Sequence, residues 1–227
     1  GYGKHQRPDL SNTQTMLDAL RDAGVPPEDE AFQRALAFIT RAQNRSESNP
    51  ASWAGDDGGF VYTPAGEGES KVESEVGSLR SYGSMTYAGF KSLLYAGLDV
   101  DDPRVQAALD WLRRHWTLEE NPGLGSQGYF YYLHVMSRAL RAFGQDSITD
   151  NSGKIHDWRR ELAERLLALQ EPDGSWVNRS SDRWLEGESC LATAYAVLAL
   201  EEVMASAVTT LPSEMVPESK ASSEKPD

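Results

Sequence analysis

Apolar residues recur along the chain at intervals of three and four positions, which is the spacing of one face of an α-helix. About seven such stretches follow one another, and almost none alternates apolar and polar residues as a half-buried strand does. The pattern therefore predicts an all-α domain over residues 1–205. Residues 206–227 are rich in Pro, Ser, Glu and Lys without an apolar period, so we expect a disordered, acidic tail there.

Four of the predicted helices share a skeleton of apolar and small residues. Each carries a Leu near its end with Ala or Ser directly before it, and the first three stop at a Gly, which can adopt the left-handed conformation that ends a helix. The aligned leucines are Leu20, Leu93, Leu140 and Leu200. We expect these apolar helices to begin near Asp9, Ser84, Gly128 and Glu188.

Three more polar helices alternate with the apolar ones, at about residues 31–44, 103–116 and 157–170. The first and third are followed by the same Asp-Gly-x-aromatic turn, which ends at Phe60 and at Trp176. The chain is thus an internal repeat of one apolar and one polar helix. Because a unit of this size cannot bury its apolar face alone, we expect several units to stack around one core.

One of these turns carries a recognisable spacing. Gln170, Gly174 and Trp176 form a Gln-x-x-x-Gly-x-Trp pattern that resembles the QW repeat of squalene and hopene cyclases. In such an element the Gln amide can bond backbone groups at helix ends while the aromatic ring covers that bond, so its role is structural. A weaker copy, across a longer insertion, consists of Gln43, Gly58 and Phe60.

The starts of three apolar helices extend the resemblance. Segments 8–14, 82–87 and 128–134 are similar to inner-helix starts in bacterial prenyltransferase and squalene-oxidase repeat proteins. The matches cover about residues 5–205, and they resemble the terpenoid cyclase and protein prenyltransferase superfamily. That resemblance implies an α/α toroid, in which inner helices ring a cavity and outer helices wrap them. About seven helices make only a partial ring, which further repeats or self-association would complete.

The resemblance also implies that the cavity holds an apolar ligand such as an isoprenoid. Aromatic faces can stabilise a passing carbocation and a His can exchange a proton, so Tyr132 and His134 are catalytic candidates, and Glu188 at a helix start is another. Each has a plainer explanation as well, as an aromatic core layer or a carboxylate at a helix amino terminus. The implied cavity lining is Met85, Tyr87, Tyr131, Tyr132, His134, Trp184 and Cys190.

The acid that cyclases use to protonate an alkene is not at its usual place. A literal Asp-x-Asp-Asp match ends at Asp102, but Pro103 follows directly, so we interpret Asp102 as the cap of a polar helix. In the register of the apolar helices, Ser11 and Asn12 replace the acids, and neither can protonate an alkene.

The zinc site of the prenyltransferases is incomplete in the same way. Cys190 opens an apolar helix, but Ala192 stands where the resemblance calls for a zinc-binding His. We therefore expect no metal and no cofactor, with Cys190 as a small buried residue.

Charge narrows the range of partners. The chain has 35 acidic against 22 basic residues, a net charge of −13. Such a surface repels phosphate backbones and anionic lipid, so we expect no nucleic-acid partner. No apolar run reaches the roughly 18 residues of a membrane span, and the first residues do not form a signal peptide, so we expect a soluble protein.

Three functions remain open at this stage. The first is a repeat domain that binds an isoprenoid or similar apolar ligand. The second is an active terpenoid cyclase or prenyltransferase whose acid lies elsewhere in a longer chain. The third is a non-catalytic scaffold that recognises a protein, because a fold does not determine a function.

Overall fold

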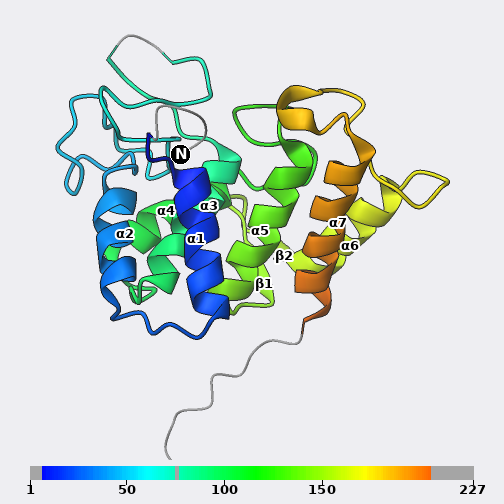
Figure 1. Cartoon of the computed structure of the whole chain (residues 1–227), viewed down its shortest axis with the longest axis horizontal. Coiled ribbons are helices and arrows are strands. Elements are labelled where there is room, and N and C mark those ends of the chain that lie inside the picture. Colours follow the sequence, from blue (N-terminus) through cyan, green and yellow to red (C-terminus); the bar gives the residue numbers. More distant parts are fainter. Residues whose placement is uncertain (1–6, 75–76, 206–227) are drawn as a thin grey trace, which may run out of the picture.

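The computed structural model describes residues 7–74 and 77–205. Within them the chain forms seven α-helices, a short 3₁₀ turn and one small sheet (Figure 1), so the all-α prediction is confirmed. The predicted tail at 206–227 lies outside the described residues. The helices are α1 (Leu10–Asp22), α2 (Glu30–Thr40), α3 (Gly83–Tyr95), α4 (Pro103–Arg114), α5 (Tyr129–Phe143), α6 (Trp158–Ala168) and α7 (Ser189–Met204).

Aspartates start four of these helices. Each side chain accepts a hydrogen bond from a backbone N–H in the first turn, which would otherwise lack a partner. Asp102 accepts from the backbone N–H of Arg104, with Pro103 as the first residue of α4. The interpretation of Asp102 as a cap is therefore confirmed. The four capping residues are Asp9, Asp29, Asp102 and Asp157.

The helices form two layers. In the first layer, α1, α3, α5 and α7 pack side by side in that order. In the second layer, α2 and α4 pack on α3, and α6 packs on α5 and α7. The amino ends of all four first-layer helices lie at the upper edge in Figure 1. Apolar and polar helices of the repeat thus alternate between layers.

Burial follows from the number of neighbours. Every residue of α3 from Gly83 to Leu93 is buried, since α1, α2, α4 and α5 surround this helix. Helix α7 packs mainly against α5 and α6, and it leaves Val197, Leu198 and Met204 exposed. None of the described helices is long and apolar enough to cross a membrane.

A small hairpin, which the apolar pattern did not predict, joins α5 to α6. Strands β1 (Ser147–Thr149) and β2 (Ile155–Asp157) pair antiparallel. The turn between them is held by the carboxylate of Asp150, which accepts from the backbone N–H groups of Ser152 and Lys154. Three-residue strands are too short to show an alternating pattern.

The two Gln–Gly–aromatic turns make the same bond. The amide of Gln43 donates to the carbonyl of Gly58 over 2.9 Å, and that of Gln170 donates to the carbonyl of Gly174 over 2.9 Å. The fully buried Gln43 also donates to the carbonyl of Arg104 in α4, over 2.8 Å. Gln170 is exposed.

The aromatic residues of these turns attach to equivalent places on the first layer. The backbone N–H of Phe60 donates to Oγ1 of Thr86 in α3, and that of Trp176 donates to Oγ1 of Thr193 in α7. Phe60 is fully buried, so this part of the connection between α2 and α3 belongs to the core. Each turn therefore ties the end of a second-layer helix to the first-layer helix that follows it.

Because they differ in burial, Gln43 and Gln170 should contribute unequally to the stability of the fold. We expect Gln43→Ala to lower the free energy of unfolding by about 2–3 kcal/mol, because the buried carbonyl of Gly58 and the partly buried carbonyl of Arg104 lose their donor. The matched variant Gln170→Ala should cost less than about 1 kcal/mol, since water can replace an exposed bond. Urea unfolding of both variants measures the difference, and equal losses would contradict this account.

Candidate functional site

The amino ends of the first-layer helices surround a pocket of about 470 Å³. This volume lies within the range of about 300–1,000 Å³ of small-molecule sites. A larger hollow of about 610 Å³, beside β2 and the end of α7, is more open to solvent. The walls of the pocket of about 470 Å³ are mostly aromatic and apolar. Its large side chains include Tyr62, Tyr82, Met85, Tyr131, Trp184 and Tyr195.

Part of the predicted lining does face this pocket. Met85 of α3, Tyr131 of α5 and Trp184 are among its walls. Trp184 belongs to the 3₁₀ turn η1 (Arg183–Leu185). It lies at the opening of the pocket, and 44% of its surface is exposed to solvent. These three residues come from separate parts of the chain that the layer arrangement brings together.

Tyr132 and Tyr87 lie in the core instead. Their rings pack on each other, 5.7 Å apart between centroids, and the Tyr132 hydroxyl donates to the carbonyl of Thr117. The physical reason is helical geometry. Successive residues are about 100° apart around the axis, so Tyr131 and its neighbour cannot both face the pocket, and Tyr87 lies opposite Met85.

The structure also corrects the expectation for Cys190 and Glu188. Both are exposed at the start of α7, and neither lines the pocket. The carboxylate that does line it is Glu186, two positions earlier and 1% exposed. Sequence reasoning missed Glu186 because the turn before α7 decides which of two nearby glutamates points inward.

Glu186 caps α5 from a distance of 55 residues in the sequence. One carboxylate oxygen accepts from the backbone N–H of Tyr131 and the other from the amide of Asn178, each over 2.8 Å. Burial raises the pKa of Glu186, and these bonds act in the opposite direction. Because both oxygens are held by protein donors, the carboxyl is a positioning group for α5.

His134 lies one helical turn after Tyr131 on the same face of α5. Its ring stacks on Tyr195, 5.7 Å between centroids, and its buried Nδ1 atom has no hydrogen-bond partner within the described chain. Burial, with Lys91 and Arg138 close by, lowers the pKa of His134 to about 3. The imidazole is therefore neutral at neutral pH and does not serve as a proton donor there.

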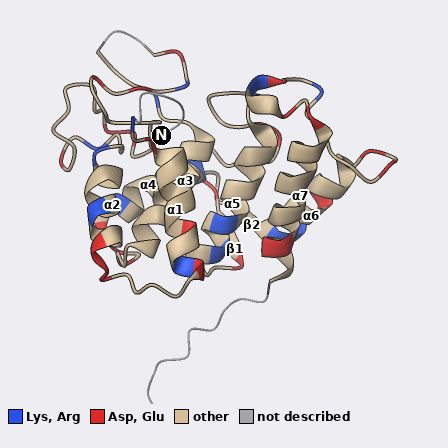
Figure 2. Cartoon of the chain, in the orientation of Figure 1, with Lys and Arg blue, Asp and Glu red and all other residues tan. Residues whose placement is uncertain are grey.

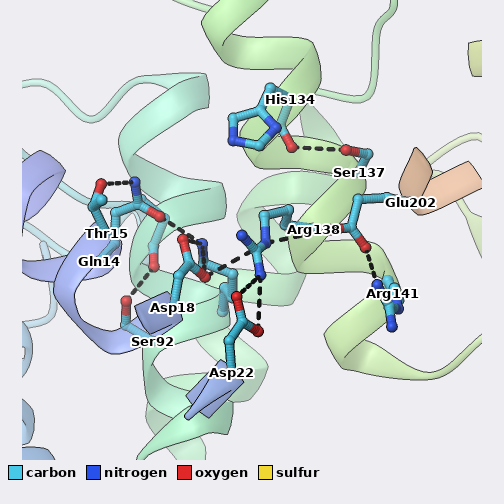
Figure 3. Close-up of polar contacts among 12 residues, drawn as sticks. Gln14, Thr15, Asp18, Asp22, Ser92, His134, Ser137, Arg138, Arg141 and Glu202 are labelled. Carbon is cyan, nitrogen blue, oxygen red and sulfur yellow. Dashed lines mark hydrogen bonds and ion pairs between the residues drawn. The ribbon is translucent and has the colours of Figure 1, made fainter. Parts of the chain in front are cut away.

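Below His134, charged side chains join all four first-layer helices (Figure 3). Lys91 of α3 is fully buried, and its Nζ atom lies 2.6 and 2.7 Å from the two carboxylate oxygens of Asp18 in α1. Arg138 of α5 lies 3.6 Å from Asp18 and 3.4 Å from Glu202 of α7. We call Lys91, Asp18, Arg138 and Glu202 the charge cluster.

None of the charge-cluster residues lines the pocket. Figure 2 shows acidic and basic positions on the lower halves of α1, α5 and α7. Arg141 adds a further ion pair to Glu202 over 2.6 Å. Sequence reasoning did not single out these residues, although a Lys within the apolar stretch of α3 was a usable signal.

The polar residues at the start of α1 form hydrogen bonds with other protein side chains. Asn12 donates to the Asp9 carboxylate, and the Ser11 hydroxyl lies 3.0 Å from the Tyr131 hydroxyl at the pocket wall.

The Arg104 side chain holds the pKa of Asp102 below its usual value, so that carboxylate stays ionised on α4. Among the described residues, no group of three or more His, Cys, Asp or Glu is placed to hold a metal ion.

The turn at the mouth has an uncommon backbone. Trp184 and Leu185 have φ angles of 60° and 66°, in the left-handed region that glycine favours. Each such residue costs on the order of 1–3 kcal/mol. A Cβ atom at position 128 would lie 3.0 Å from the Trp184 ring, so Gly128 permits this ring to cover the start of α5.

Comparison with known proteins adds no relative: no family model matches this sequence, and no curated protein and no solved structure matches it.

Proposed function

We propose that this chain is an α/α-toroid repeat domain that binds an apolar ligand, such as an isoprenoid, at the amino ends of its first-layer helices. The observation that carries the proposal is the aromatic pocket of about 470 Å³ where α1, α3, α5 and α7 converge. A few hydroxyl groups at its wall, such as that of Ser11, would orient a ligand that the rings enclose.

Two features support the toroid as the architecture. Helices of the repeat alternate between two layers, and the first-layer helices share one direction. Equivalent Gln–Gly–aromatic turns attach to Thr86 and Thr193, one repeat pair apart. This is the arrangement that the resemblance to squalene cyclases and prenyltransferases implies, with the chain as a partial ring.

The side chains around the pocket favour binding over proton-transfer chemistry. The His134 imidazole is neutral, and the Glu186 carboxyl is engaged by backbone and amide donors. Alkene protonation requires an acid that is free to give its proton to the ligand. We therefore propose a binding domain, with the cyclase or prenyltransferase activity as an alternative that needs an acid from elsewhere.

Farnesol, an isoprenoid alcohol, tests this function by isothermal titration calorimetry. We expect saturable binding at one site, and we expect Ser11→Trp to weaken it at least about tenfold because the indole would fill the pocket. Met16→Trp is the matched control, since Met16 is exposed on the same helix and outside the pocket. Absence of farnesol binding, or equal weakening by both variants, would contradict the proposal.

A scaffold that recognises another protein is the second candidate. The observation in its favour is the apolar surface of α7, where Val197, Leu198 and Met204 are exposed. Apolar patches of this kind mark interaction sites. This function does not need the pocket, so Ser11→Trp would leave it intact.

A further inference from the structure

One cationic side chain, that of Lys71, stands at the pocket wall. Lys71 lines the pocket, with its Nζ atom 4.1 Å from the centroid of the Tyr62 ring. Lys71 bonds to Glu69, and the other oxygen of Glu69 accepts from Arg7 over 2.9 Å. One carboxylate is thus shared by two cations, so the group of Arg7, Glu69 and Lys71 carries a net charge of +1.

The amino ends of three helices also contribute positive potential at the pocket. The first turns of α1, α3 and α5 reach the pocket at Ser11, Ser84 and Gly128. A helix amino terminus carries roughly half a positive charge. The carboxylate that lines the pocket, Glu186, has both oxygens engaged, by the backbone N–H of Tyr131 and the amide of Asn178.

The pocket differs from the acidic molecule as a whole. The chain carries a net charge of −13, yet the pocket combines apolar walls with the Lys71 ammonium and the amino ends of three helices. A partly buried ammonium interacts more strongly with an anion than an exposed one does, because the surroundings screen it less. The pocket therefore suits a ligand with an apolar body and an anionic head.

We propose that the ligand is an amphiphile with one carboxylate, whose apolar chain lies among the aromatic side chains and whose head group binds Lys71. The inference rests on the proposed function, because it assigns the head group of a ligand for the same pocket. The single ammonium at the wall matches a head group with one negative charge. A diphosphate carries more negative charge than this ammonium can neutralise, and a cationic head would meet the Lys71 ammonium.

Matched ten-carbon ligands test the head group. We expect calorimetry at low ionic strength to show decanoate binding about tenfold more tightly than decanol, and decyltrimethylammonium binding more weakly than decanol. In Lys71→Gln the affinity for decanoate should fall to that for decanol, while decanol binding stays unchanged. The unchanged affinity for decanol also shows that the variant pocket is folded.

Arg34→Gln is the matched control, because it removes one positive charge from an exposed ion pair with Glu30 on α2, away from the pocket. It should leave the tenfold preference for decanoate in place. Equal affinities of decanol and decanoate would overturn the inference and leave the proposed function standing. Tighter binding of geranyl diphosphate than of decanoate would also overturn it, whereas failure of decanol, decanoate and farnesol together would end the proposed function.

Discussion

Replacing Lys91 with Met is expected to lower the free energy of unfolding by about 3–5 kcal/mol, the usual cost of removing one partner from a buried ion pair. Lys91 is fully buried and contacts both oxygens of Asp18. In the variant, the nearest remaining cation to this carboxylate is the side chain of Arg138, 3.6 Å away. Urea unfolding at pH 7 measures the loss.

Two further variants show whether the ion pair is the cause. Lys91→Met/Asp18→Leu should recover most of the loss, because replacing a whole buried pair by apolar side chains is often neutral. Arg34→Met, which breaks an exposed pair with Glu30, should cost less than about 1 kcal/mol. A Lys91→Met variant as stable as Arg34→Met would contradict the expected role of the charge cluster.

The same pair predicts a dependence of stability on pH. Burial lowers the pKa of Lys91 from 10.5 to about 8, with Asp18 acting against this effect. Between these two values the unfolded chain binds more protons than the folded one, so the contribution of Lys91 to stability rises with pH. This pH-dependent contribution to stability is absent once the pH has fallen through about 8, because Lys91 is then protonated in both the folded and the unfolded chain. The stability of the native chain relative to Lys91→Met should therefore increase between about pH 8 and pH 10.5.

Phe60→Ala is expected to lower the free energy of unfolding by about 3–5 kcal/mol, as for other buried aromatic residues. Phe60 is fully buried and its ring packs over Gly89 of α3, where a Cβ atom would lie 2.5 Å from the ring. The absence of a side chain at Gly89 makes the room that the ring occupies. Chemical unfolding measures the loss.

A double-mutant cycle with Gly89→Ala isolates this contact. Alone, Gly89→Ala should destabilise the fold because the added methyl group collides with the Phe60 ring. In the Phe60→Ala background the same methyl group has room, so its cost should disappear or reverse. Additive effects of the two substitutions would show that the ring and the glycine are energetically independent.

Local signals were sufficient to predict most helix positions. The apolar helices were expected near Asp9, Ser84, Gly128 and Glu188, and they begin at Leu10, Gly83, Tyr129 and Ser189. Periodicity and capping residues act over a few neighbouring positions, so they can be read without knowledge of the fold. The hairpin at β1 and β2 was missed because its strands are too short for a pattern.

The pocket was only partly predictable. Of the residues expected at its wall, Met85, Tyr131 and Trp184 line it, whereas Tyr87, Tyr132, His134 and Cys190 do not. The carboxylate at the wall is that of Glu186 and not that of the candidate Glu188. Which of two nearby side chains faces inward depends on the rotation of a helix about its axis and on the left-handed turn at Trp184. Neither is specified by residue type.

Residue patterns along the chain are enough to establish the helical class, the alternation of apolar and polar helices, and the capping role of Asp102. The pairing of Lys91 with Asp18, 73 residues away, and the capping of α5 by Glu186 emerge only from the packed fold. The two groups of features differ in the sequence distance over which their interactions act. Helix formation and capping depend on neighbours within a turn or two, whereas ion pairs and pocket walls depend on packing between residues that are far apart in the chain.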